Sequence, residues 1–125
     1  MNLGSPDSTA VPDVRKYLNE FLFDERVIDF SWVFRKVLVQ GIIVPRRAPE
    51  SAKAYETIWT KEGSPLIVNT KALAARLQEK VPEPVVISMR YGNPSMASAY
   101  ASLLSQVPDL DEVLAVPLYP SHRKT

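Results

Sequence analysis

The chain has no cysteine, a single histidine and only four glycines among its 125 residues. Without cysteine, this chain cannot form disulfides, thiolate metal sites or an iron–sulfur cluster of its own, and it has no cysteine nucleophile. The one histidine, His122, cannot make a His-rich metal site, and no HExxH pattern accompanies it. We expect His122 to be a surface residue. No GxxxxGK phosphate loop occurs either.

A charge of one sign and long apolar runs are also lacking. The net charge is +1, and the 15 lysines and arginines are scattered along the chain, so nothing indicates nucleic-acid binding. No apolar run approaches the roughly 18 residues that cross a bilayer. The longest, Val37–Val44, is interrupted by Gln40 and Gly41, and it suits at most a membrane surface or a hydrophobic mouth.

Apolar residues spaced by three and four predict helices over residues 11–22, 31–40, 49–59, 70–80 and 95–106. Residues 7–9 are candidate N-caps of the first helix, with Pro12 in its first turn. Pro45 and Pro49 are expected to end the second helix and begin the third. The stretch 66–68 is too short to assign, and residues 24–29 look like a connector. Most of the large aromatic residues are expected in the core, although some of them could line an apolar pocket; they are Phe21, Phe23, Phe30, Trp32, Phe34 and Trp59.

Two apolar runs, residues 85–89 and 112–118, predict buried strands, since both of their faces are apolar as in a parallel sheet covered by helices. With the helix between them they would form a right-handed βαβ unit, so the class is α/β. Met1–Gly4 resembles the end of a strand, and the chain stops just after residue 118. We therefore expect a single domain that is truncated at both ends.

Ligands of open α/β sheets bind beyond the carboxyl ends of the strands. Three loops follow strands here, at residues 4–6, 90–94 and 119–122, and they would meet at one rim if the strands are neighbours. Glycine and proline there could simply make turns. Arg90 and Tyr91 favour a ligand site, since a turn needs neither a guanidinium nor a phenol. The pair Arg46 and Arg47 suits a carboxylate, although adjacent arginines often form a solvated loop.

Several short motifs occur in the same order as in one known family. They are Met1–Pro6 (MNLGSP), Tyr17–Leu22 (YLNEFL), Ile43–Arg47 (IVPRR), Tyr55–Trp59 (YETIW), Glu62–Leu66 (EGSPL), Met89–Pro94 (MRYGNP) and Pro117–Pro120 (PLYP). In this order they resemble the N-terminal part of a ferrochelatase. The resemblance implies a Rossmann-like, chelatase-like parallel sheet flanked by helices, the incomplete first half of a two-domain fold with residues 1–125 as its N-terminal domain.

The resemblance also implies site residues around a porphyrin. Positions matching those that the family uses are Leu3, Arg46 or Arg47, Tyr55, Ser64, Arg90 and Tyr91. Coproporphyrin-using members of the family often carry a tyrosine that ligates iron at the position of Leu3. Leucine cannot ligate a metal, which favours protoporphyrin IX while leaving coproporphyrin III open.

By this resemblance the protein takes part in haem biosynthesis as a lyase that inserts Fe²⁺, its substrate, into a porphyrin without a required cofactor. The family's catalytic histidine and glutamate lie beyond Thr125, so we expect this chain alone to be inactive, with no catalytic or metal-binding residue of its own. The implied location is the cytoplasm, with peripheral membrane contact. Self-association through exposed sheet edges is a further expectation. The alternative is a non-catalytic α/β module that binds a porphyrin or another anion.

Overall fold

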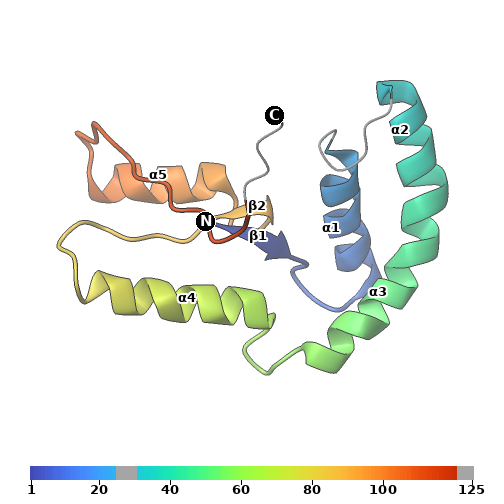
Figure 1. The fold of residues 1–125 in the computed structure, drawn as a ribbon, viewed down its shortest axis with the longest axis horizontal. Helices are drawn as coiled ribbons and strands as arrows, with labels where there is room; N and C mark the ends of the chain where they lie inside the picture. Colours follow the sequence, from blue (N-terminus) through green and yellow to red (C-terminus); the bar gives the residue numbers. More distant parts are fainter. Residues whose placement is uncertain (25–30, 121–125) are drawn as a thin grey trace. The chain divides into compact units, whose positions relative to one another are not determined.

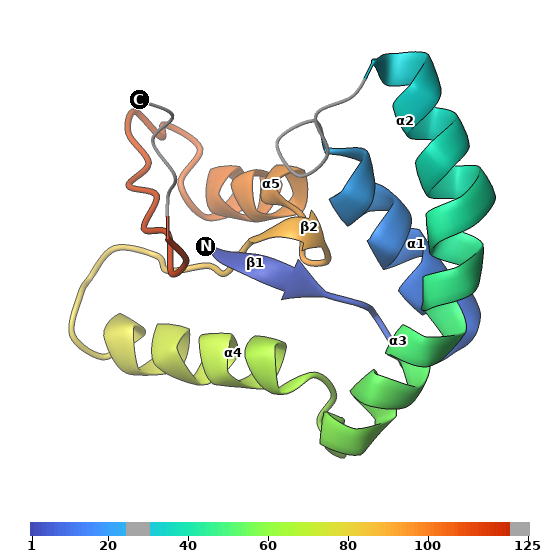
Figure 2. The same ribbon diagram turned by 45° about the vertical axis from the view of Figure 1, so that its right-hand side comes forward.

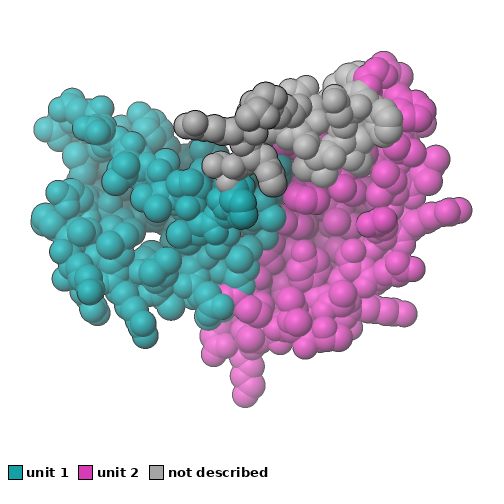
Figure 3. All heavy atoms as spheres, in the orientation of Figure 1, with its two compact units in different colours: residues 1–4, 66–125 teal, residues 5–65 magenta. Residues whose placement is uncertain are grey.

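The computed structural model describes residues 1–24 and 31–120, which divide into two compact units (Figure 3). Unit 1 comprises residues 1–4 and 66–125, and unit 2 comprises residues 5–65. The predicted connector at 24–29 lies outside the described residues except for Asp24, and Phe30 and His122 lie outside them as well.

Unit 1 is built around a pair of parallel strands (Figure 1). The strands are β1 (Asn2–Ser5), whose last residue belongs to unit 2, and β2 (Met89–Gly92). Helix α4 (Pro65–Gln78) lies on one side of this strand layer and α5 (Met96–Gln106) on the other, in both Figure 1 and Figure 2. The buried residues in the described part of this unit are few: Gly4, Thr70, Met89, Tyr91 and Ala99.

Unit 2 contains α1 (Val11–Phe23) and a long helical run made of α2 (Trp32–Leu38), the π-helical turn η1 (Val39–Ile43) and α3 (Val44–Ile58). Helix α1 packs against α3 and η1. The apolar residues buried here are Val14, Tyr17, Val39, Val44, Ala48 and Ala52. Val44, Ala48 and Ala52 repeat every four residues, which makes one buried stripe along α3.

The structure corrects the prediction that Pro45 and Pro49 separate two helices. The N–H of Val44 donates to the carbonyl of Val39, five residues back, so the run changes register just before Pro45. Pro45 then lies in the first turn of α3, where no helical N–H bond is required of it. Pro49 lies inside α3. Both prolines are exposed, so water can reach the Pro45 carbonyl that Pro49 leaves without a donor.

The predicted strands are displaced or missing. Residues 84–88 precede β2 and do not form a strand; within the described residues β1 reaches them only at Ser88, whose carbonyl accepts from the Asn2 N–H at 3.0 Å. Residues 112–117 form no strand and are exposed, so the prediction of a second buried strand, and with it the βαβ unit, is wrong. A strand requires a paired neighbour, and within residues 1–24 and 31–120 Met1 alone pairs with this segment.

Smaller differences concern helix ends and one aromatic residue. The N-cap of α1 is Ala10 rather than residues 7–9, although Ser8 accepts a hydrogen bond from the Ala10 N–H. Residues 66–68 belong to α4. Phe34 was expected in the core but is 54% exposed. The helices at 11–22, 70–80 and 95–106 are confirmed as α1, α4 and α5 within a few residues. No helix in the described ranges is both long and apolar enough to span a bilayer.

Candidate functional site

The carboxyl end of β1 lies directly against β2. Gly4 has φ +129°, and a Cβ built on it would stand 1.9 Å from the carbonyl oxygen of Tyr91. No side chain fits at that distance, so glycine is what allows the two backbones to approach so closely. The approach brings Leu3 and Gly4 beside Arg90 and Tyr91, as expected for loops at the carboxyl ends of neighbouring parallel strands.

Asn2 ties β1 to helix α4. Its Nδ2 donates to the hydroxyl of Thr70 at 3.1 Å, and that hydroxyl donates to the Leu66 carbonyl at 2.6 Å. The Oδ1 of Asn2 accepts from the backbone N–H of Leu3 at 2.8 Å. The Asn2 amide is thus engaged on both sides, which orients the backbone at Leu3.

Strand β2 places Arg90 and Tyr91 differently. Met89 and Tyr91 are buried, whereas Arg90 between them is half-buried, as alternation along a strand requires. The Arg90 guanidinium carbon lies 5.5 Å from the centre of the Tyr91 ring, within cation–π range. Tyr91 is only 6% exposed, so its ring offers little surface to a ligand. Arg90 is the more accessible of the two.

The turn after β2 leads into α5. Gly92 has φ +78°, and the Asn93–Pro94 peptide is cis. The Pro94 carbonyl accepts from the Met89 N–H at 2.8 Å, which closes the turn. Ser95, which the sequence predicted as the first residue of a helix, caps α5 by accepting from the Ser98 N–H at 3.1 Å. The Gly-Asn-Pro stretch therefore has a full structural role.

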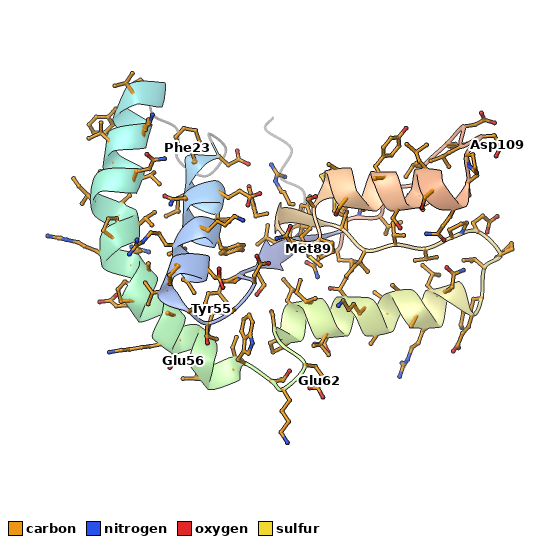
Figure 4. The ribbon with its side chains drawn as sticks, turned by 180° about the vertical axis from the view of Figure 1, so that it is seen from behind. Phe23, Tyr55, Glu56, Glu62, Met89 and Asp109 are labelled. Carbon is orange, nitrogen blue, oxygen red and sulfur yellow. The ribbon has the colours of Figure 1, made fainter. Side chains whose placement is uncertain are left out.

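Helix α3 carries three of the predicted residues. Arg46 and Arg47 lie in its first turn and are exposed. Tyr55, further along the helix, is half-buried, and its ring meets that of Trp59 edge-on at 6.2 Å (Figure 4). Burial raises the pKa of Tyr55 above its ordinary value, because the phenolate would lose hydration. Tyr55 is therefore a neutral hydrogen-bond donor at physiological pH.

Two buried serines complete the candidates. Ser64, predicted from the sequence, is 6% exposed and follows a turn closed by reciprocal 3.0 Å bonds between Thr60 and Gly63. Ser5 was not selected as a site residue. It ends β1, is 3% exposed, and its hydroxyl has no hydrogen-bond partner within the described part of the chain. The signal for Ser5 in the sequence was its place at the carboxyl end of a strand.

The predicted residues fall into two groups. Unit 1 brings together Leu3, Arg90 and Tyr91, while Arg46, Arg47, Tyr55 and Ser64 belong to unit 2. Among the described residues, no group of three or more histidine, aspartate or glutamate side chains is placed to hold a metal ion. The chemistry that these residues offer is apolar contact, cationic charge and neutral hydroxyl donors.

Comparison with known proteins shows the family to which the chain belongs. The ferrochelatase family model matches residues 1–125. The chain belongs to the ferrochelatase family. Its curated relatives include ferrochelatases of Opitutus terrae (54% identity, 98% of this chain and 36% of the relative), Vibrio parahaemolyticus (42%, 100% and 38%) and Bdellovibrio bacteriovorus (47%, 98% and 36%). No solved structure gives a significant match.

Membership of the ferrochelatase family confirms the resemblance that the ordered motifs indicated. The chain spans little more than a third of the length of these relatives, from 36% to 38%. The α/β class with a small parallel sheet is likewise confirmed. The individual porphyrin contacts at Leu3, Arg46, Arg47, Tyr55, Ser64, Arg90 and Tyr91 stay predictions.

Proposed function

We propose that this chain forms one wall of the porphyrin site of a ferrochelatase, which inserts Fe²⁺ into protoporphyrin IX or coproporphyrin III in haem biosynthesis. The observation that carries the proposal is the family match over residues 1–125. Unit 1 would be part of a Rossmann-like sheet in the first half of a two-domain fold. The juxtaposition of Leu3 with Arg90 at the carboxyl ends of β1 and β2 supports this, because ligands of such sheets bind at those ends.

The chemistry of unit 1 suits a porphyrin, which is a flat apolar ring with propionates at its edge. Leu3 offers an apolar side chain, and the half-buried Arg90 offers a guanidinium that is already held near the Tyr91 ring. A guanidinium fork matches a carboxylate, and holding it in place lowers the entropy lost on binding. Leu3 has no atom that ligates iron, so protoporphyrin IX is the favoured substrate.

In unit 2, helix geometry separates the two arginines of α3. At about 100° per residue, Tyr55 lies about 80° from Arg47 around the helix axis but about 180° from Arg46. Tyr55 shares the side of the buried stripe Val44, Ala48 and Ala52. A ligand that contacts the Tyr55 hydroxyl therefore has Arg47 within reach, while Arg46 extends from the opposite side of α3.

Metal insertion must release the two pyrrole protons of the porphyrin as Fe²⁺ enters. A base near the ring has to accept those protons. By family resemblance the histidine and glutamate with this role lie beyond Thr125. We therefore propose that residues 1–125 bind the porphyrin without metalating it.

The apolar side chains exposed on α2 and η1 support a further part of the proposal, a cytoplasmic protein in peripheral contact with a membrane. They are Val33, Phe34, Val37 and Ile42. A helical segment with such residues can lie at the headgroup boundary, where its apolar side chains leave water. Co-sedimentation with liposomes, compared between the unaltered chain and Phe34→Ser, tests this contact.

Titration of protoporphyrin IX, followed by anaerobic addition of Fe²⁺, tests the main proposal. We expect a shift of the Soret band on binding and no metalloporphyrin spectrum afterwards. Arg90→Ala and Arg47→Ala should each weaken binding roughly five- to tenfold, as expected for a lost charge-assisted hydrogen bond. Arg76→Ala on α4 and Arg15→Ala on α1 are matched controls, since both arginines are exposed and lie outside the proposed site.

Two results would contradict this account. Metalloporphyrin formation by the chain alone would refute the inactivity. Unchanged spectra, or equal weakening by the Arg76 and Arg15 controls, would refute the assignment of a porphyrin wall to these residues.

A further inference from the structure

The side chain of Asn2 points toward helix α4, because its Nδ2 donates to the hydroxyl of Thr70 at 3.1 Å. A hydroxyl has a single proton, and Thr70 donates that proton to the Leu66 carbonyl at 2.6 Å. Thr70 is 5% exposed, so water has little access to either bond. The hydroxyl of Thr70 is therefore fixed in place as the acceptor for Asn2.

The bond to Thr70 also decides which way the Asn2 amide is turned. One end of a carboxamide donates hydrogen bonds and the other accepts them. With Nδ2 held at Thr70, the Oδ1 of Asn2 is the atom that meets the backbone N–H of Leu3, which donates to it at 2.8 Å. Turned over, the amide would set its NH₂ group against that N–H and lose the bond. A buried hydroxyl on α4 thus fixes the backbone at Leu3.

The register of β1 on β2 determines which side chains share a face of the strand pair. The Asn2 N–H donates to the Ser88 carbonyl at 3.0 Å. In a parallel pair, that bond places Asn2 beside Met89, and it places the next residues, Leu3 and Arg90, beside each other. Neighbouring residues of paired strands point to the same face, and successive residues point to opposite faces. Since Asn2 faces α4, Leu3 and Arg90 both project from the face away from α4.

The two side chains on that face are held in place by different means. Both Leu3 and Arg90 are half-buried, so each keeps surface that a ligand can contact. Neighbouring strands lie about 4.8 Å apart, which lets the two side chains reach the same ligand. The Arg90 guanidinium carbon lies 5.5 Å from the centre of the Tyr91 ring. Leu3 has no polar group in its side chain, so its position depends on the backbone that Asn2 and Thr70 hold.

We propose that Thr70 is a positioning residue of the porphyrin wall. Through Asn2 it holds Leu3 beside Arg90, so that an apolar side chain and a guanidinium meet the ligand together. This inference rests on the proposed function, in which Leu3 and Arg90 contact the porphyrin. Thr70 itself makes no contact with the ligand, since it is buried on the opposite face. Its effect is on affinity, because a side chain that is held before binding loses less entropy when the ligand binds.

Titration of protoporphyrin IX into variants of the whole 125-residue chain tests the effect on affinity. Thr70→Val keeps the shape of the side chain but removes the hydroxyl, and it should bind the porphyrin roughly three- to fivefold more weakly. Thr70→Ser keeps the hydroxyl and should bind within about twofold of the unaltered chain. Asn2→Ala removes the same link from the strand side, leaves α4 unaltered and should weaken binding by the same factor as Thr70→Val. Ser105→Ala is the matched control, since the exposed Ser105 hydroxyl donates to a carbonyl of its own helix, that of Ser102.

Double substitutions separate positioning from a general loss of structure. If Thr70 acts through Leu3, then Thr70→Val should change the affinity less than about 1.5-fold in a chain that already carries Leu3→Ala, because no side chain is left there to position. Combined with Arg47→Ala, whose residue lies in unit 2, the effect of Thr70→Val should instead multiply with that of the second substitution. A general loss of structure would weaken binding equally in both backgrounds.

NMR measures the positioning of Leu3 without any porphyrin. Hydrogen exchange at the Leu3 amide should speed up roughly fivefold in Thr70→Val, because the acceptor at Asn2 is no longer held by α4. It should stay unchanged in Thr70→Ser and in Ser105→Ala. Nuclear Overhauser contacts between the Leu3 methyl groups and the Arg90 side chain should be present in the unaltered chain and weaken in Thr70→Val.

The two measurements distinguish this inference from the function on which it rests. If the unaltered chain bound no porphyrin, the porphyrin wall would be refuted, and the positioning of Leu3 by Thr70 would be decided by the NMR measurements. If the unaltered chain bound porphyrin and Thr70→Val bound it equally well, the positioning role alone would be refuted. Unchanged exchange at Leu3 in Thr70→Val, or equal weakening of binding by Thr70→Ser or Ser105→Ala, would overturn the inference as well.

Discussion

The close approach of Gly4 to Tyr91 allows a test in which three glycines separate two physical effects. Gly4 combines φ +129° with a virtual Cβ 1.9 Å from the Tyr91 oxygen. Gly63 has φ +111° but nothing within 4 Å of its virtual Cβ, and Gly41 has neither a positive φ nor a neighbour within 4 Å. Gly4→Ala therefore measures the backbone effect and the steric clash together. Gly63→Ala measures the backbone effect alone, and Gly41→Ala measures neither.

The magnitudes follow from the geometry. A left-handed φ costs an alanine about 1–2 kcal/mol, which is the whole effect expected for Gly63→Ala. In Gly4→Ala the methyl group must move away from a backbone oxygen by roughly an ångström, which weakens the β1–β2 hydrogen bonds. Loss of two such bonds adds about 2 kcal/mol, for a total of about 3–4 kcal/mol. Gly41→Ala should stabilise by about 0.5–1 kcal/mol, since glycine is the poorer helix former.

Residue-resolved hydrogen exchange is the suitable assay, because Gly4 and Gly63 lie in different units. Opening free energies are compared at the amides of β1 and β2 for Gly4→Ala and at those of α3 for the other two variants. If Gly4→Ala lowered the opening free energy no more than Gly63→Ala, β1 and β2 would not be in close contact at Gly4. The inference that Leu3 lies beside Arg90 would then be refuted.

Two further predictions concern single side chains. The tyrosinate absorbance that Tyr55→Phe removes should have its titration midpoint above pH 10, because burial raises the pKa of Tyr55 above the ordinary tyrosine value of 10.0. The folding stability supplied by the neutral Tyr55 phenol is then complete below pH 10 and is lost as the pH rises through the raised pKa; a midpoint at or below pH 10 would place Tyr55 in water. Thr70→Val should lower the free energy of unfolding in urea by about 1–2 kcal/mol, since it leaves the side-chain amide of Asn2 without its hydrogen-bond acceptor. Thr57→Val, which deletes an exposed 2.6 Å bond to the Ala54 carbonyl, should cost under about 0.5 kcal/mol, and equal costs would show that the Asn2–Thr70 bond is not formed.

Periodicity predicted α1, α4 and α5 because their signals are local. The start of α5 shows how local such signals are, since the Ser95 hydroxyl that caps the helix and the N–H that it accepts from lie three residues apart. The run from α2 to α3 could not be predicted in this way. Proline is a reliable helix breaker only if the hydrogen-bond register is constant, and the turn η1 changes that register just before Pro45.

The candidate site could likewise be predicted from the sequence only in part. The proximity of Leu3 to Arg90 could be predicted, because the carboxyl ends of neighbouring parallel strands lie at the same edge of a sheet. Burial escaped the sequence: Tyr91 alternates inward beside Met89, and Ser5 is buried with an unpartnered hydroxyl. Neither fact is visible in residue type, because both depend on which face of a strand meets the rest of the unit.

The two misplaced strands have one physical cause. Residues 85–88 and 112–118 are apolar enough for a buried sheet, yet pairing requires a neighbouring backbone, and in the described part of the chain only Met1 and Asn2 provide one. The apolar pattern therefore identified segments with strand propensity, whereas strand formation also requires a neighbouring backbone to pair with, and the pattern of a single segment does not show whether that neighbour is there.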